Sequence, residues 1–173
     1  MIINASPLII FGKLNRISLL KKIYLTLEIA ESVYEEAVTK GMEKNVRDAF
    51  IINENISNKN IIVVELNGKF EQQAKKISEI YGIDIGESET IALALQLGKK
   101  EVVIDEKAAR EAAKAVGVKP IGSLRVLLMA FARNLLTKAE IKEIVTEMEN
   151  TKYRFSPQVL IEFWNIFDKV KNK

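Results

Sequence analysis

Two apolar stretches of the sequence are each followed at once by residues with oxygen-bearing side chains. Ile2–Ile3 leads into Asn4, and Val103–Ile104 leads into Asp105 and Glu106. In an open parallel sheet the carboxyl ends of the strands meet at one edge, and ligands bind there. These side chains are therefore candidates for one site. Asp105 could equally serve as the N-cap of a helix that begins near Glu106, and both roles are compatible.

Two glutamates stand at the start of a segment that is otherwise almost entirely apolar. Residues 86–89 read Gly-Glu-Ser-Glu, and Ile, Leu and Ala dominate the residues that follow. A helix that is apolar around most of its circumference is buried, so these acids lie at the edge of the core. Glu87 and Glu89 point about 200° apart on a helix, and they cannot serve one site equally. The spacing from Asp84 to Glu87 also fits a capping box, which gives Glu87 a purely structural alternative.

A third acidic pair, Glu35 and Glu36, follows Val33 and Tyr34 in a segment with helical periodicity. Both glutamates lie roughly 130° from the centre of the apolar face of that helix. Helical phase therefore does not choose between them. Either can also be an ordinary charge on a solvated helix face.

The sequence contains neither cysteine nor histidine. This excludes disulfides, thiolate nucleophiles, Ser-His-Asp triads and zinc sites of the Cys/His type. Any metal would have to be held by carboxylate, amide or hydroxyl oxygens, which suit Mg²⁺ or Mn²⁺. The net charge of +3 and the pI near 9.0 are compatible with a nucleic-acid partner, although the basic residues are scattered along the chain.

The 173 residues correspond to about one domain, and no flexible linker separates the last third from the rest. The longest apolar runs are shorter than a membrane span, and the first residues do not resemble a secretory signal. We therefore expect a cytoplasmic protein that does not enter the membrane.

Short apolar stretches alternate with helical patterns along the chain. We expect strands at 1–3, 24–27, 61–64, 102–104 and 118–121. We expect helices at 7–14, 17–22, 30–40, 44–55, 70–81, 86–97, 106–116, 123–135, 138–148 and 157–169. This order predicts an α/β fold with a parallel sheet covered on both faces, strand 61–64 being buried on both. Ser6 and Ser156 are expected to cap helices, and Gly41 to end one.

Several segments match, in order, those that PIN domains carry. They read Asn-Ala-Ser-Pro-Leu-Ile (4–9), Ala-Glu-Ser-Val-Tyr-Glu-Glu (30–36), Gly-Glu-Ser-Glu-Thr-Ile-Ala-Leu-Ala (86–94), Val-Ile-Asp-Glu-Lys-Ala-Ala-Arg (103–110), Ile-Gly-Ser-Leu (121–124) and Tyr-Arg-Phe-Ser-Pro (153–157). The sequence resembles in particular a prokaryotic branch of formerly unknown function that is similar to the VapC-type toxin nucleases. The resemblance covers essentially the whole chain.

The resemblance implies a single three-layer α/β/α PIN-like domain over residues 1–173, with a central parallel sheet and with 123–173 as a helical C-terminal extension packed on it. An acidic pocket at the strand ends would bind one or two Mg²⁺ or Mn²⁺ ions and hydrolyse RNA phosphodiesters. The implied catalytic acids are Glu36, Glu87 and Asp105, and the implied metal ligands are Asn4, Glu87, Asp105 and Glu106. Glu106 is the alternative to Asp105 in the fourth acid position. Ser6 and Glu89 would support the site.

Asn4 is the departure from the common pattern, because most PIN domains carry Asp in this position. Its amide oxygen can ligate a metal but brings no negative charge, so we expect weaker metal binding. The leading interpretation is a metal-dependent endoribonuclease, the toxin-like component of a toxin–antitoxin pair. The alternative is a PIN-fold RNA- or protein-binding module with weak or no catalysis.

Partners follow from the same resemblance. An antitoxin protein is one expected partner, and relatives often form homodimers. The apolar stripe Leu160, Phe163, Trp164 and Phe167 on the last helix could supply a dimer interface or pack into the core. A nucleotide-binding doubly wound protein is disfavoured, because no glycine-rich loop follows the first strand.

Overall fold

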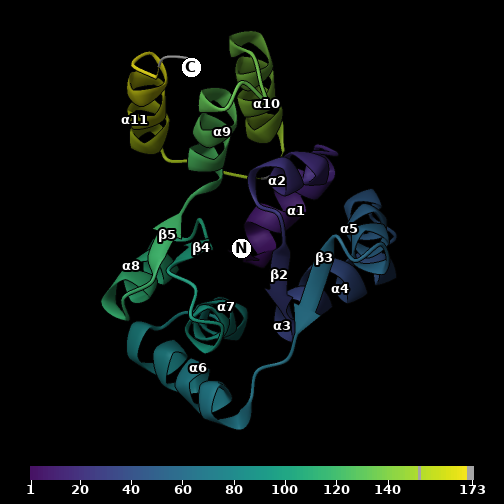
Figure 1. Cartoon of the computed structure of the whole chain (residues 1–173), viewed down its shortest axis with the longest axis vertical. Helices are drawn as coiled ribbons and strands as arrows, with labels where there is room; N and C mark the ends of the chain where they lie inside the picture. Colours follow the sequence, from purple (N-terminus) through teal and green to yellow (C-terminus); the bar gives the residue numbers. More distant parts are fainter. Residues whose placement is uncertain (152, 171–173) are drawn as a thin grey trace.

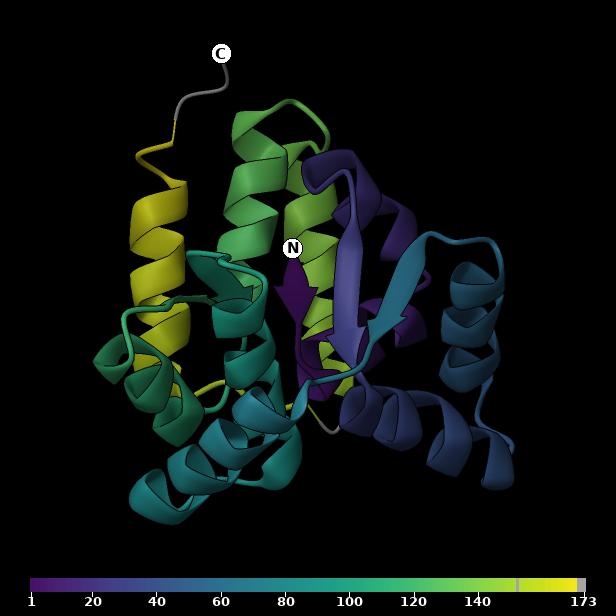
Figure 2. The same cartoon turned by 60° about the horizontal axis from the view of Figure 1, so that its bottom comes forward.

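The computed structural model describes residues 1–151 and 153–170, and a parallel sheet lies at its centre (Figures 1 and 2). Its strands are β1 (Ile2–Ile3), β2 (Leu27–Ala30), β3 (Ile61–Val64), β4 (Glu101–Val103) and β5 (Lys119–Ile121). They form a five-stranded sheet in the order β3-β2-β1-β4-β5, with every pair parallel. The central parallel sheet predicted from the sequence is confirmed.

Helices connect the parallel strands, since each crossover must return to the same end of the sheet, and further helices follow the last strand. They are α1 (Ala5–Lys13), α2 (Ile17–Ile23), α3 (Glu31–Tyr34), α4 (Lys40–Glu43), α5 (Arg47–Ser57), α6 (Gly68–Tyr81), α7 (Ile85–Gln96), α8 (Lys107–Ala115), α9 (Ser123–Ala132), α10 (Lys138–Asn150) and α11 (Pro157–Phe167), with a π-helical segment η1 (Glu35–Thr39) between α3 and α4. Helix α7, whose middle residues from Thr90 to Ala94 are buried, packs on β1, β2 and β4. The arrangement is the predicted three-layer α/β/α fold.

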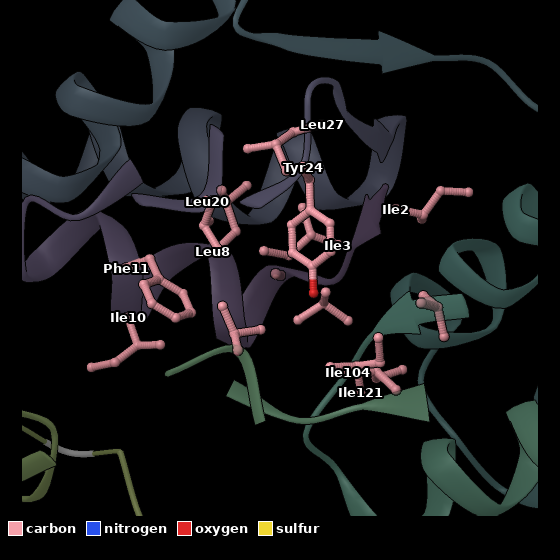
Figure 3. Packing of buried hydrophobic residues seen from close by; sticks show 14 of the residues in the cluster. Ile2, Ile3, Leu8, Ile10, Phe11, Leu20, Tyr24, Leu27, Ile104 and Ile121 are labelled. Carbon is pink, nitrogen blue, oxygen red and sulfur yellow. The ribbon is translucent and has the colours of Figure 1, made fainter. Parts of the chain in front are cut away.

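One hydrophobic core contains residues from the first strand and helix and from the last three helices. Figure 3 shows side chains of β1, α1, α2, β2 and β5 packed together, with Tyr24 among them. Figure 1 shows α9, α10 and α11 side by side at one end of the molecule, with α6 and α7 at the opposite end. Phe163 and Phe167 are buried, and the Phe167 ring centroid lies 4.8 Å from that of Phe131 in α9. Half of the apolar stripe on α11 therefore faces the core.

The second strand begins later than the sequence predicts. Residues 24–27 alternate like a strand, but Tyr24 closes α2 by donating its N–H to the Leu20 carbonyl. Leu25 is almost fully exposed, and pairing with β3 starts at Leu27 opposite Ile61. The expectation of a strand at 24–27 is wrong, because a short alternating run does not show which residues can reach a neighbouring strand.

Two helix boundaries also differ from the expectation. Ser6 does not cap the first helix: α1 begins at Ala5, and Asn4 occupies its N-cap position. Gly41 does not end a helix, since the helical path from Glu31 continues through it to Glu43. A Cβ on Gly41 would lie 2.6 Å from the Ala49 Cβ, so this glycine permits close packing of α4 on α5.

Strand β3 is not buried on both faces, contrary to the prediction. It forms one edge of the sheet, and Ile62 is 44% exposed there. An apolar run alone does not distinguish an edge strand from a central one. Across the described part of the chain, no helix is both long enough and apolar enough to cross a membrane.

Candidate active site at the carboxyl edge of the sheet

Asn4 is fixed at the end of the central strand, with only 4% of its surface exposed. Its backbone N–H donates to the Val103 carbonyl over 2.9 Å, which joins the ends of β1 and β4. Its side-chain Oδ1 lies 3.1 Å from the hydroxyl oxygen of Thr90, a fully buried residue of α7. Asn4 directly precedes α1 in the sequence, but its side-chain amide is hydrogen-bonded to a different helix, α7.

Asp105 follows β4 and accepts hydrogen bonds from two distant segments. The Ser123 N–H donates to one carboxylate oxygen over 2.8 Å, and the hydroxyls of Ser123 and Tyr153 donate to the other. Ser123 is the first residue of α9, so Asp105 caps that helix from outside it. The idea that Asp105 caps the helix after β4 is wrong, because Glu106 occupies the N-cap position of α8.

Gly122 allows this approach. A Cβ on Gly122 would lie 3.1 Å from the Asp105 Oδ1 and 3.2 Å from the Arg110 Nη1. The guanidinium of Arg110 also donates to the Ile104 carbonyl over 3.1 Å. Gly122, at the N-cap of α9, has no side chain of its own to cap the helix. The space is taken by the carboxylate of Asp105, which accepts the Ser123 N–H instead.

Glu87 stands at the first turn of α7 in the capping box that the sequence predicts. The Asp84 N–H donates to its Oε2 over 3.1 Å. Burial raises the pKa of Glu87 above its ordinary value, and the charges of Glu106, Asp84 and Glu36 add to the rise, against the lowering by this hydrogen bond. The capping role does not exclude chemistry, since one carboxylate oxygen can cap the helix while the other faces the neighbouring acids.

Glu36 lies beside the same helix end. A Cβ on Gly86 would be 3.9 Å from the Glu36 Oε2 and 3.7 Å from the Ser32 hydroxyl oxygen. Much of the Glu36 surface is exposed, yet the adjacent protein removes enough water to raise its pKa. Asp84 raises that pKa further, and Lys40 opposes the rise. Within the described chain, the Ser32 hydroxyl oxygen is buried and has no hydrogen-bond partner.

The structure thus brings Glu36 and Glu87 together with Asp84 and Glu106 at the start of α7. It also places Asn4 and Asp105 at the ends of the adjacent strands β1 and β4. Ser6 and Glu106 line one cavity with Asp105. Glu89 lines a different, smaller cavity of about 180 Å³ with Glu65. Glu89 therefore faces away from Glu87, as the helical phase predicts.

The donor chemistry suits Mg²⁺ or Mn²⁺, but the arrangement does not yet form a metal centre. Among residues 1–151 and 153–170, no three acidic side chains are close enough to hold an ion together. The Asp105 carboxylate is occupied by Ser123 and Tyr153, and the Asn4 amide by Thr90. As arranged, these residues do not fit a bound divalent cation.

Two of these acids have a raised pKa. A carboxyl group whose pKa is raised toward neutrality exchanges protons more readily near pH 7 than an exposed acid does. Acids with perturbed pKa values that lie close together are often found at functional sites. Burial raises the pKa of both Glu36 and Glu87, and the charge of Glu36 adds to the rise at Glu87.

Sequence reasoning missed three side chains that hold this site. Thr90 contacts Asn4, and Ser123 and Tyr153 contact Asp105. The sequence offers one hint of the role of Thr90: it and Ser88 are polar residues that interrupt the apolar face of α7, and both are fully buried. Tyr153 lies 48 residues from Asp105, and no local pattern could connect them.

One comparison identifies the family. A family model described as a PIN domain matches residues 1–169. No curated protein matches the sequence. The match spans the five strands, the carboxyl edge with its acids and the helices through α11. The chain belongs to the PIN domain family.

Proposed function

We propose that this protein is a ribonuclease that hydrolyses RNA phosphodiesters. PIN domains are generally nucleases, and the family match covers almost the whole chain. The observation that carries the proposal is the pairing of Glu36 and Glu87, two acids of raised pKa, beside the start of α7. Such groups can accept a proton from a water that attacks a phosphodiester, and donate one to the leaving oxygen.

Each site residue then has a distinct task. Glu87 is held by the Asp84 N–H and acts as proton acceptor, with Glu36 as its acidic neighbour. Asp105 ties α9 to the end of β4 and orders this side of the site. Asn4 contributes an uncharged polar group at the centre of the sheet edge, so it does not repel a phosphate.

The proposal includes dependence on Mg²⁺ or Mn²⁺. The sequence offers oxygen donors and neither cysteine nor histidine, so a hard divalent cation is the matching choice. Because no three acids of the described residues converge, binding would require Asp105 or Asn4 to exchange a present hydrogen bond for the ion. Metal dependence is therefore tested separately from cleavage, by isothermal titration with Mn²⁺ and by activity in EDTA.

The biological setting is part of the proposal. The resemblance to the VapC-type branch supports a cytoplasmic toxin-like component with an antitoxin protein as partner, acting as a homodimer. It also supports one functional domain over 1–173, with 123–173 as its helical extension. Of the apolar stripe on α11, Leu160 and Trp164 are the half-buried members left to contribute to a dimer interface.

Cleavage of a labelled single-stranded RNA in Mn²⁺, followed on denaturing gels, tests the proposal. Glu87→Gln is the informative variant, because glutamine keeps the capping hydrogen bond and removes the charge. Glu89→Gln on the same helix is the matched control, since Glu89 faces another cavity. We expect cleavage to fall by at least about a hundredfold for Glu87→Gln and to stay near the parent for Glu89→Gln. Equal activity of Glu87→Gln and the parent would contradict the assignment, whereas activity that persists in EDTA would contradict only the metal dependence.

The second candidate is a PIN-fold binding module without catalysis, and the buried Asn4 favours it. An uncharged amide that is hydrogen-bonded to Thr90 leaves the site one acid short. Isothermal titration with Mn²⁺ separates the two candidates. No heat of binding at millimolar Mn²⁺, together with RNA that is bound and left intact, would select the binding module.

A further inference from the structure

A cavity of about 780 Å³ opens beside Asp105, between α9 and the C-terminal helix α11. We call it the C-terminal pocket. Its lining includes three groups of residues that bear on its ligand. Ser6, Asp105 and Glu106 form the end next to the candidate site; Leu124, Leu128, Val159 and Phe163 form an apolar wall; and Arg110, Arg125 and Arg154 bring positive charge.

The size of this pocket suits a small organic group. Cavities that enclose ligands are typically about 300–1,000 Å³ and are mostly apolar, with a few placed polar groups. The wall meets that description, since Leu124, Leu128 and Phe163 are nearly buried while Val159 is 44% exposed at the opening. Tyr153 and Phe155 also line the pocket, with ring centroids 5.3 Å apart in an edge-to-face pair.

Charge narrows the choice of ligand. Arg125 and Arg154 are exposed and Arg110 is half-buried, with one nitrogen already donating to the Ile104 carbonyl. Acids line the pocket as well, including Glu111 and Glu162. A small, highly charged anion such as inorganic phosphate gains little from such a mixed lining. A ligand with a flat apolar body and a single negative charge satisfies both the wall and the arginines.

An unpaired nucleotide has that chemistry. Single-stranded RNA is recognised by stacking its bases on aromatic and apolar side chains while arginines contact the phosphates. A protein helix would also meet an apolar wall, but the pocket includes Asp105, Glu106 and Ser6 of the candidate site. An occupant that continues into the reacting centre is a segment of the substrate.

We propose that the C-terminal pocket binds one unpaired nucleotide of the RNA substrate, its base against Val159 and Phe163 and its phosphodiester against Arg154 and Arg125. The inference rests on the proposed function, because it assigns part of the substrate. It makes the helical extension 123–173 a recognition element for single-stranded RNA.

Binding of a fluorescein-labelled hexauridylate, measured by fluorescence anisotropy in EDTA, tests the inference without cleavage. Val159→Trp fills the opening, and Ile161→Trp is its matched control, because Ile161 is 61% exposed on the same helix and lies outside the lining. We expect Kd to rise about tenfold for Val159→Trp, the loss of roughly one base contact. The control should stay within about twofold of the parent.

The phosphate contact has its own readout. Arg154→Gln should weaken binding about tenfold and reduce the slope of log Kd against log salt by about 0.7, the contribution of one phosphate on a single strand. Arg47→Gln is the control, since Arg47 is exposed at the start of α5 and does not line the pocket. A structural role of Arg154 alone would not change the salt slope.

The outcomes separate the two proposals. If the parent cleaves RNA while Val159→Trp and Arg154→Gln bind as the parent does, the pocket assignment is wrong and the ribonuclease stands. If both variants lose binding while no condition gives cleavage, the pocket assignment stands and the ribonuclease fails. A parent that does not bind the hexamer overturns the pocket assignment, and a protein segment is then the occupant to seek.

Discussion

The Asn4 amide and the Thr90 hydroxyl meet 3.1 Å apart at the buried junction of β1 and α7. The same hydroxyl oxygen lies 2.8 Å from the Gly86 carbonyl. A hydroxyl has one proton, so Thr90 can donate to only one of these oxygens at a time. When Thr90 donates to Gly86, an asparagine can turn its NH₂ toward Thr90 and donate in return. An ionised aspartate has no proton to offer, so the pair suits Asn4 in particular.

Asn4→Asp should therefore destabilise the protein in a pH-dependent way. Burial raises the pKa of an aspartate at this position above the unfolded value of about 3.9. The variant loses stability as pH rises above that unfolded pKa, because the folded state holds the proton more tightly. We expect a deficit of about 2 kcal/mol relative to the parent at pH 7.5, and a much smaller one at pH 4.5. Urea unfolding at the two pH values measures it.

Addition of Mn²⁺ provides the control for this variant. A divalent ion that binds next to the new carboxylate restores its stability, and it should raise the Tm of Asn4→Asp more than that of the parent. Asn4→Ala, which removes the polar group without adding charge, should show no such response. Identical pH profiles for Asn4→Asp and the parent would show that the position is not desolvated.

Local sequence signals predicted the parts of this site that depend on neighbours in the chain. The capping box of Asp84 and Glu87 was found from spacing alone, because both partners lie within one helical turn. The parallel sheet followed from apolar runs separated by helical patterns. The failure at Gly41 has the opposite cause. A glycine after a helical pattern usually ends the helix, but here its small size serves contact with Ala49 on another helix.

The rest of the site depends on contacts between segments far apart in the sequence. Asp105 receives hydrogen bonds from Ser123 and Tyr153, which are 18 and 48 residues away. The sequence suggested that Asp105 caps the helix next to it, and only the tertiary fold shows that it caps α9 instead. The choice of Glu36 over Glu35 is likewise tertiary, since the position of Gly86 against η1 brings the Glu36 carboxylate close.

Gly122→Ala should disturb the carboxylate of Asp105. The new methyl group would be only 3.1 Å from Oδ1 and 3.2 Å from the Arg110 guanidinium, so at least one side chain must move. We expect a loss of about 1–2 kcal/mol in the free energy of unfolding, together with reduced RNA cleavage. Gly68→Ala is the matched control, because a Cβ there meets nothing within 4 Å. Equal stability of the two variants in urea would show that Asp105 tolerates the displacement.

Tyr24 should make the protein sensitive to alkali. Burial raises its pKa from 10.0 to about 12, with a further contribution from the charge of Glu101. Stability from the neutral phenol is complete below pH 10 and is lost as pH rises through about 12. Between pH 9 and 11.5 the parent should lose about 2 kcal/mol through this group. The Tyr24→Phe variant has no phenol to ionise, so its free energy of unfolding should fall by about 2 kcal/mol less than that of the parent over the same pH interval. Parallel urea curves for parent and variant at both pH values would contradict the prediction.

Tyr153→Phe tests whether the Tyr153 hydroxyl and a metal ion compete for the Asp105 carboxylate. Its hydroxyl donates to the carboxylate oxygen that Ser123 also contacts, and desolvation with the adjacent Asp105 charge raises the Tyr153 pKa. Phenylalanine keeps the ring contact with Phe155 and removes one donor to a charged carboxylate, which costs about 1.5–3 kcal/mol of stability. The freed lone pair should raise Mn²⁺ affinity about tenfold, the equivalent of one hydrogen bond to a charged group. Isothermal titration of Tyr153→Phe measures this gain. Tyr81→Phe, at an exposed tyrosine on α6, serves as the control. If Tyr153→Phe is less stable but binds Mn²⁺ no better than Tyr81→Phe does, then Asp105 is a structural cap for α9 and the metal, where used, binds elsewhere.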